Sequence, residues 1–236
     1  MPNPLILKLE RANVLAPEDR ARLESIIAQT RKIAPREDLI REGEVPDTVR
    51  LVLDGFACRY KVLSNGKRSI VGFLLPGDFC DFHVAILSQM DHAIATITPC
   101  TIVEISRATI DDLNENFPRI TRALWWATLV DEATLREWLV NIGGRPADKK
   151  VAHLFCELHL RLQVVGHAGE NSFPLPLTQE ELGDTLGIST VHVNRVLQQL
   201  REDGLIQHQG RVVTVPDVAR LREFAGFNPN YLHLKP

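Results

Sequence analysis

Hydrophobic and polar positions along the chain follow two different periods. Between residues 31 and 105 the pattern is strand-like. In the segment FACRYKV (residues 56–62), the side chains Phe56, Cys58, Tyr60 and Val62 occupy every second position, as on one face of a strand. Short runs of this kind are separated by turn signals, and the pair Asn65-Gly66 predicts a two-residue hairpin turn. Short strands at this spacing are typical of an all-β sandwich or barrel, and a small helix over about residues 17–29 is expected before it.

From Pro118 to about Ile142 the period becomes helical, and Gly143-Gly144 predicts both its end and a hinge. At 1.5 Å per residue this helix is about 37 Å long. Most of the apolar positions that share one face of this helix are spaced by three and four residues and form a stripe. The stripe also contains the charged residue Asp131, and a charge in a seam between helices lowers stability. The stripe fits a helix packed on its own sheet, or a helix that also contacts a second subunit. We expect dimerisation through Ile120, Leu124, Ala127, Leu135, Trp138 and Ile142, with Trp125 and Trp126 on the flanks.

The segment TQEELGDTLGISTVHVNRVLQQLREDG, residues 178–204, predicts two short helices joined by a tight turn. Thr178 followed by Glu181 is a capping box, Gly187 ends the first helix, and Ser189 caps the second. Gly183 lies inside the first helix, where glycine costs roughly 1 kcal/mol relative to alanine. Two helices joined so closely must cross and touch. We therefore expect Gly183 to lie at their contact, in a helix-turn-helix motif.

The second helix has an inward face and an outward face. Val193, Val196 and Leu197 are expected inside, so Thr190, Val191, Asn194 and Arg195 face outward and are the predicted base-contacting residues, with Arg195 suited to guanine and Asn194 to adenine. LIQHQGRVVTV, residues 205–215, predicts a hairpin that makes the motif winged. Predicted DNA-backbone contacts are Thr178, Gln179, Ser189, His192, Gln198, Gln209 and Arg211. Asp217 is expected to cap a last helix through Ala225.

Composition limits the possible functions. The net charge is −3, and from Arg145 to the end ten Lys and Arg balance ten Asp and Glu, so any contact with DNA must be local. No run approaches the roughly 20 apolar residues of a membrane span. The N-terminus lacks the pattern of a signal peptide, so a cytoplasmic protein that does not contact membranes is expected. Cys58, Cys80, Cys100 and Cys156 are too dispersed for a zinc or iron–sulfur site and are expected to be free and buried, although a redox-sensing cysteine stays open.

Taken together, the helix-turn-helix segment, the turn-rich β segment with REGE and PGDF, and the long helix resemble the Crp/Fnr family of bacterial transcription regulators. The resemblance covers nearly the whole chain. It implies an α+β fold with an N-terminal cyclic-nucleotide-binding-like β jelly roll (residues 1–117), a dimerisation helix with its hinge (118–144) and a winged helix-turn-helix (145–236). It also implies a cytoplasmic homodimer that binds double-stranded DNA at a near-palindrome with half-sites about 34 Å apart, with RNA polymerase as a further possible partner.

The chain departs from the family at the effector site. Members that bind cyclic nucleotides hold them with a Gly-Glu pair and a later Arg-Ser pair. Here Asp81-Phe82 and His92-Ala93 stand roughly at those places, and no Arg or Lys occurs between Arg68 and Arg107. A phosphate lacks its bidentate partner, so no cyclic AMP binding is expected. Any effector pocket is placed at Asp81, His83 and His92.

No cofactor is predicted. The clustered N-terminal cysteines of iron–sulfur members are absent, although one of the eight histidines would suffice as a haem ligand. On the DNA side, many members have Glu where Val191 stands, which puts the usual half-site in doubt.

Two other functions stay open at this point. Asp81, His83 and His92 are also the residues that a jelly-roll metalloenzyme would use for a divalent ion. Alternatively, the neutral C-terminal segment fits an interaction protein that retains the fold without binding DNA. The favoured prediction is a sequence-specific DNA-binding transcription regulator and not an enzyme. Its effector, and whether it activates or represses, are not readable from the sequence.

Overall fold

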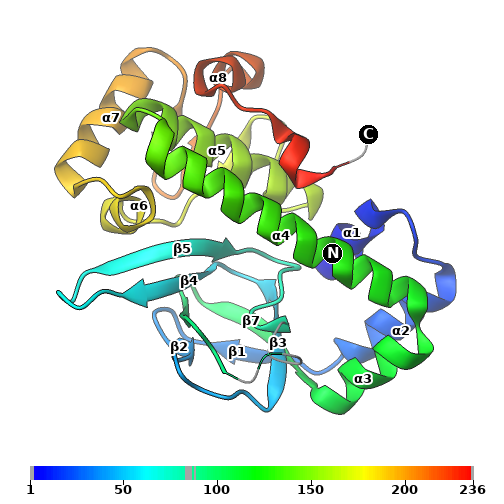
Figure 1. Cartoon of the computed structure of the whole chain (residues 1–236). Coiled ribbons are helices and arrows are strands. Elements are labelled where there is room, and N and C mark those ends of the chain that lie inside the picture. The colour runs from blue at the N-terminus through cyan, green and yellow to red at the C-terminus, as the bar shows by residue number, and fades with distance from the viewer. Residues whose placement is uncertain (1–2, 83–86, 88, 235–236) are drawn as a thin grey trace. The chain divides into compact units, whose positions relative to one another are not determined.

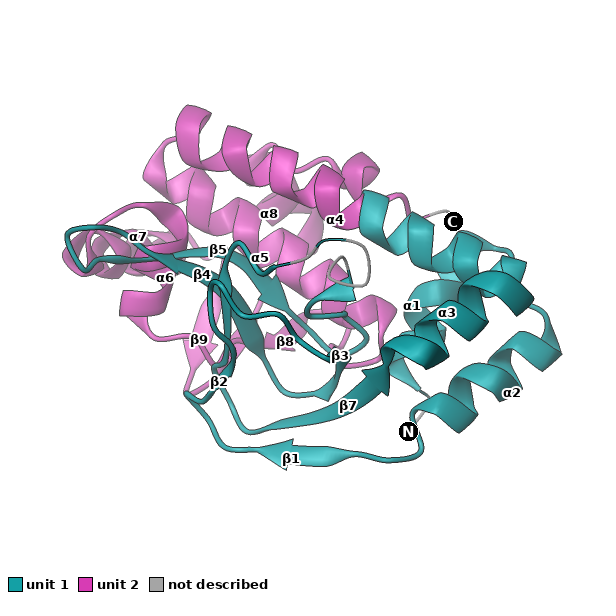
Figure 2. Ribbon diagram, turned by 60° about the horizontal axis from the view of Figure 1, so that its bottom comes forward, with its two compact units in different colours: residues 1–129 teal, residues 130–236 magenta. Residues whose placement is uncertain are grey.

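The computed structural model describes residues 3–82, 87 and 89–234. The chain forms two compact units, Met1–Leu129 and Val130–Pro236 (Figure 2). The boundary falls inside the long helix α4 (Pro118–Gly144), whose limits agree with the predicted helix. The sequence pattern had set this helix apart as a segment of its own, whereas its two halves belong to different units.

The first unit contains two antiparallel sheets, with strand orders β1-β7-β3 and β2-β6-β4-β5 (Figure 1). The strands are short and separated by turns, which confirms the predicted β domain. Their bounds are β1 Arg31–Ile33, β2 Asp38–Ile40, β3 Thr48–Asp54, β4 Ala57–Val62, β5 Arg68–Leu74, β6 Ala93–Thr96 and β7 Cys100–Ser106. Helices α1 (Pro4–Leu9) and α2 (Pro17–Ile26), with a 3-10 turn Glu10–Ala12 between them, precede the sheets, and α3 (Arg107–Asn116) follows. Neither α1 nor α3 was predicted.

The β4–β5 hairpin differs in detail from the prediction. β4 pairs with β5 up to Val62 opposite Arg68, so residues 63–67 form the loop and the turn is longer than two residues. The alternation predicted for residues 56–62 also fails, because Ala57 is buried and Val62 is exposed. The start of β4 lies between β5 and β6, whereas its end extends beyond β6, and a register shift follows Arg59.

Two apolar clusters hold the first unit together. One fills the space between the two sheets and includes Ile40, Leu74, Ile94 and Ile102. The other packs helices onto β3 and β7, and it takes in Ile120, Ala123, Leu124 and Ala127 of α4 as well as Leu5, Leu23, Val49 and Ile110. The first turns of α4 are therefore part of the core of this unit.

This packing corrects the predicted dimerisation stripe. Ile120, Leu124 and Ala127 are buried in their own chain, and so is Trp138. Leu135 and Ile142 alone among the predicted contacts are exposed. The larger exposed apolar side chains of α4 are Trp125 (63% exposed), Leu129, Leu139 (72%) and Val140. A helical period shows which residues share a face of the helix. It does not show whether an apolar face packs against other parts of the same chain or stays exposed.

The second unit contains the end of α4, α5 (Ala147–Val164), α6 (Gln179–Leu186), α7 (Thr190–Glu202) and α8 (Val218–Ala225). A small sheet of order β8-β10-β9 accompanies them (β8 Ser172–Pro174, β9 Gln207–Gln209, β10 Val212–Thr214), and a 3-10 turn, Pro229–Leu232, follows α8. Helix α5 packs against α7 and α8. The predicted wing hairpin and the predicted cap of Asp217 on α8, which accepts from the Arg220 N–H at 2.9 Å, are both confirmed.

All four cysteines are free and buried, as expected. Burial raises the pKa of Cys100 to about 11, and it raises the pKa of Cys156 to about 12. Both groups are therefore protonated thiols near neutral pH. Within the described part of the chain, no helix has the length and apolarity that crossing a bilayer requires.

Candidate nucleic-acid interface

The start of α6 is fixed by the predicted capping box. The Thr178 hydroxyl accepts from the Glu181 N–H (3.1 Å), and the Thr178 N–H donates to Glu181 Oε2 (2.7 Å). The helix ends at Gly187, which has φ +66°, a left-handed conformation that glycine adopts without strain. The N–H of Gly187 donates to the carbonyl oxygen of Gly183 at 2.9 Å and closes the last turn. Both ends of the helix are thus set by local sequence.

Gly183 packs against the turn that joins the two helices. A Cβ atom at this position would lie 2.7 Å from the backbone carbonyl oxygen of Ile188 and 3.7 Å from the Thr190 nitrogen. A contact of 2.7 Å is far shorter than ordinary van der Waals contact, and a backbone carbonyl in a tight turn cannot move away easily. The glycine is therefore required because α6 lies against the backbone of the turn before α7; the sequence had predicted a contact between the helices themselves.

Helix α7 presents one buried face and one exposed face. Ser189 caps it by accepting from the His192 N–H (3.2 Å), and Val193, Val196, Leu197 and Leu200 are buried. The four predicted base-contacting residues, Thr190, Val191, Asn194 and Arg195, are all exposed. The orientation predicted from the sequence is confirmed; their contacts with DNA remain predictions.

Two of these side chains have an unusual environment. Val191 is 72% exposed on the first turn of α7, so most of its apolar surface faces solvent. Arg195 forms no hydrogen bond or ion pair with any residue that the structure describes. A free guanidinium and an exposed isopropyl group on one helix face are suited to contact a partner rather than to stabilise the monomer.

The predicted backbone-contacting residues lie around this face, but not all of them are free. His192, Gln209 and Arg211 are exposed, the last two at the tip of the wing between β9 and β10. The hydroxyls of Thr178 and Ser189 already cap helices, and Gln198 donates to Glu202 at 2.9 Å. Gln179 is half-buried and accepts a hydrogen bond from the Asn194 side chain at 3.2 Å. This last contact was not predicted, because the two residues belong to different helices and no spacing along the chain relates them.

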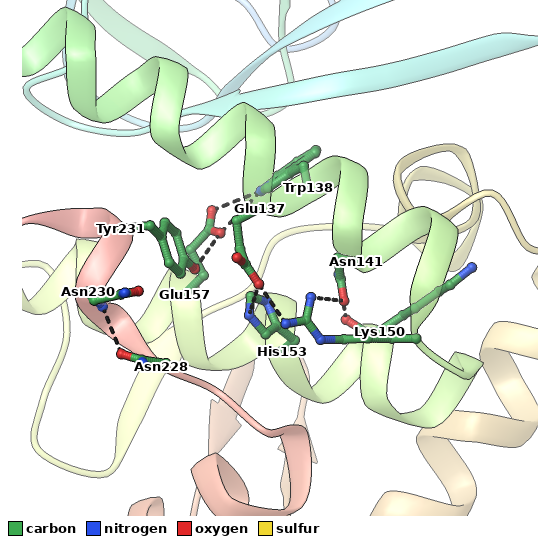
Figure 3. A network of polar contacts seen from close by, with 10 residues as sticks. Glu137, Trp138, Asn141, Lys150, His153, Glu157, Asn228, Asn230 and Tyr231 are labelled. Carbon is green, nitrogen blue, oxygen red and sulfur yellow. Dashed lines mark hydrogen bonds and ion pairs between the residues drawn. The ribbon is translucent and has the colours of Figure 1, made fainter.

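Behind the interface, a buried carboxylate joins three elements of the second unit. Glu157 of α5 is fully buried and accepts from Trp138 Nε1 (3.1 and 3.2 Å), from Tyr231 Oη (2.9 Å) and from Arg161 (3.1 Å). Figure 3 shows Trp138 reaching it from α4 and Tyr231 from the C-terminal turn. Burial beside Glu157 raises the pKa of Tyr231, so its hydroxyl stays a donor. A charge in the interior is tolerated when it is paired in this way.

A second polar group spans the two glycines at the end of α4. Arg145 donates to Glu137 Oε1 (2.6 Å), and Asn141 donates to the carbonyl oxygen of Lys150 (3.2 Å). His153 Nε2 lies 3.2 Å from the same Glu137 oxygen (Figure 3). These contacts connect α4 to α5 on both sides of residues 143–144. The corner that was predicted to be a hinge is therefore cross-linked by side chains.

The predicted effector residues do not form a cluster that the structure describes. Asp81 is buried and accepts from the Arg50 N–H (2.7 Å) and from the Arg50 guanidinium (3.2 Å). Burial nevertheless raises the pKa of Asp81 to about 6. His92 Nδ1 lies 2.7 Å from Asp91 Oδ1, and His83 lies outside the described residues. Among the described residues, no group of three His, Cys, Asp or Glu has the arrangement of a metal site.

Comparison with known proteins agrees with this arrangement. Residues 149–224 match the family described as the Crp-like helix-turn-helix domain, and residues 30–116 match the cyclic nucleotide-binding domain. The chain is 32% identical over 213 residues to the transcriptional activator protein FnrL of Cereibacter sphaeroides, which covers 89% of this chain and 85% of FnrL. It is 28% identical over 189 residues to the nitrogen fixation regulation protein FixK of Bradyrhizobium diazoefficiens (80% and 78% covered). The solved structure of FixK2 from Bradyrhizobium japonicum superposes with a TM-score of 0.74 at 25% identity, covering 83% of this chain and 96% of that one.

Proposed function

The chain belongs to the Crp/Fnr family of transcription regulators, and on that premise we propose that it acts as a homodimer that reads a nearly palindromic DNA site through α7. As a member it is a DNA-binding transcription regulator and not an enzyme. The observation that carries the proposal is the outer face of α7, which exposes Val191 and an unpaired Arg195 beside each other on a helix whose inner face is buried.

Base recognition is proposed for the exposed N-terminal half of α7. Arg195 has the planar donor pair that guanine O6 and N7 accept. Val191 offers a methyl surface for thymine and no acceptor for cytosine N4, so the half-site should contain thymine at the position facing it. Thr190 and Asn194 complete the set. Ser189, His192, Gln209 and Arg211 are assigned to the DNA backbone, together with Thr178, Gln179 and Gln198, where they fix register without reading sequence.

For dimerisation we propose the exposed stripe of α4 instead of the stripe that the sequence favoured. The stripe contains Trp125, Leu129, Glu132, Arg136 and Leu139, whose spacings of four, three, four and three residues are those of a coiled-coil seam. Val140 extends its apolar surface. In the middle of the stripe, Glu132 and Arg136 form an ion pair with each other within the helix at 2.8 Å, so each charge is offset inside its own chain, although charged residues are less favourable in a seam than apolar ones.

We propose that signals reach the recognition helix along α4. The contact of Asn141 with Lys150 holds the end of α4 against α5, and the contact of Glu137 with Arg145 ties the connection between the two helices back to α4. A displacement of α4 is thus expected to move the second unit as one piece, rather than to be absorbed at Gly143-Gly144. Two recognition helices of a dimer would then change their spacing on DNA.

No cyclic AMP is expected to bind. The buried carboxylate of Asp81 would repel a phosphate, and Arg50, the cation beside it, is already engaged by that carboxylate. We propose no cofactor, a cytoplasmic location and, as a further partner, RNA polymerase.

Selection of binding sites from a random duplex library tests the proposal. Wild-type protein and the variant Arg195→Ala are used at one fixed salt concentration, and Arg31→Ala, which changes an exposed arginine of β1, serves as the matched control. Wild type and the control are expected to enrich the same palindrome, whereas Arg195→Ala loses its guanine preference. Enrichment of one sequence by all three proteins would refute the role of Arg195 in base recognition, and enrichment of none would refute DNA reading in the absence of an effector.

A further inference from the structure

The side-chain contact between α6 and α7 carries an inference beyond this assignment. Asn194 Nδ2 donates to Gln179 Oε1 at 3.2 Å, and no other partner of the Asn194 side chain occurs among the described residues. Gln179 is the first residue of α6 and Asn194 lies in the second turn of α7, so the contact crosses the helix-turn-helix. Both residues stand on backbone that is fixed by caps, the capping box of Thr178 on one side and Ser189 on the other.

The contact determines which groups Asn194 offers to a partner. An asparagine amide has two N–H donors and one carbonyl acceptor. One donor is used by Gln179, which leaves one donor and the acceptor on a side chain that is exposed. That pair complements the acceptor N7 and the donor N6 amino group of adenine, the usual partner of asparagine in the major groove. Without Gln179 the amide would be free to turn about its terminal torsion, which is broad and roughly two-fold.

We propose that Gln179 is a positioning residue for base recognition: it holds the Asn194 amide in the orientation that reads adenine. The inference rests on the proposed function, and it gives Gln179 a role in specificity that a contact to the DNA backbone does not have. The two roles are compatible, because the hydrogen bond uses the carbonyl oxygen of Gln179 and leaves its Nε2 group free to donate to a phosphate. When DNA excludes water from the contact, the hydrogen bond becomes stronger.

Two substitutions of Gln179 separate positioning from backbone contact. Gln179→Met keeps the length of the side chain and removes the acceptor. Gln179→Glu keeps the acceptor and adds a negative charge beside the phosphates. Both are helix formers, and glutamate is favourable in the first turn of a helix, so neither disturbs α6. Asn194→Ala identifies the base position that is read.

The measurement is the affinity of each protein for the wild-type-selected duplex and for duplexes substituted at single positions. Asn194→Ala is expected to lower the preference for adenine at one position of each half-site by roughly tenfold or more. Gln179→Met is expected to lower the preference at that same position by roughly threefold to tenfold, with preferences elsewhere unchanged. Gln179→Glu should keep the preference while weakening binding to all sequences alike.

The outcomes separate this inference from the proposed function. If wild type selects a site but Gln179→Met weakens all sequences equally, Gln179 contacts only the backbone and the positioning role is wrong, while DNA reading stands. The same conclusion follows if Asn194→Ala changes no base preference. If wild type selects no site at all, the proposed function fails and this inference fails with it.

Discussion

Replacing Gly183 by alanine tests whether the two helices meet as described. Alanine favours a helix over glycine by roughly 1 kcal/mol, so an isolated helix would gain stability. Here the new Cβ would lie 2.7 Å from the Ile188 carbonyl oxygen, about 0.7 Å inside the 3.4 Å at which ordinary contact begins. The neighbour is backbone, and its turn is held by the hydrogen bond from the Gly187 N–H to the Gly183 carbonyl oxygen. Overpacking of this kind typically costs about 1–3 kcal/mol.

The cost is expected near the upper end of that range, because a carbonyl in a capped turn has little freedom to move. The net effect of Gly183→Ala is therefore a loss of about 1–2 kcal/mol. Gly143→Ala is the matched control, since Gly143 is also helical and a Cβ there would meet nothing within 4 Å. That variant should gain about 0.5–1 kcal/mol.

Thermal unfolding followed by far-ultraviolet circular dichroism measures both, with Tm shifts of about 2–4 °C per kcal/mol. Opposite signs are expected for the same chemical substitution at two helical glycines. If Gly183→Ala raised Tm as much as Gly143→Ala does, the close approach of α6 to the Ile188 carbonyl would be refuted, and with it the reason given for the glycine.

Three further predictions concern other parts of the chain. Tyr231→Phe removes a donor from a buried carboxylate and should lower the free energy of unfolding by about 1–3 kcal/mol. In the control Tyr60→Phe the lost hydrogen bond, to Asp38, is exposed, so the loss of stability should be smaller. Equal losses in denaturant titrations would contradict the role of the buried network. Leu139→Glu should produce monomers in sedimentation analysis. Val45→Glu, which changes an exposed apolar residue of the first unit, should leave the protein dimeric. A dimeric Leu139→Glu protein would exclude the proposed seam. Burial and the nearby arginine lower the pKa of His153 to about 4, so on acidification the unfolded chain binds the proton at a higher pH than the folded chain does. The free energy of unfolding should therefore fall as the pH drops from 6.5 to 4, by up to about 3 kcal/mol relative to His153→Gln. A difference between the two proteins that does not vary with pH would refute this.

The helix-turn-helix was readable from the sequence because its determinants are local. Thr178, Gly187 and Ser189 set the ends of the helices through contacts within four residues, and the period of Val193 and Val196 determines the inner face. The capped helix α8 and the wing hairpin were predicted for the same reason. Of the helices that were missed, α3 begins at a Ser106 cap and α1 at an Asn3 cap followed by proline, so sequence signals were present for both.

What the sequence did not provide depends on contacts between distant segments. The stripe of Ile120, Leu124 and Trp138 had the correct helical period, but its partner is the chain itself, and no local pattern shows this. Glu157 lies in an apolar helical run, where its burial depends on Trp138 and on Tyr231, 74 residues further along. The contact of Gln179 with Asn194 likewise depends on the crossing of two helices, not on the spacing along either one.

The most direct test of the central claim is the affinity of the protein for its selected duplex with base pairs inserted at the centre. Inserting about five base pairs rotates one half-site by half a helical turn relative to the other, and inserting about ten brings both half-sites back to the same face of the duplex. A dimer that reads two half-sites should lose specific binding with the first insertion and regain part of it with the second. Unchanged affinity in all three duplexes would show that a single recognition helix binds alone, and would contradict the account of a two-fold reader.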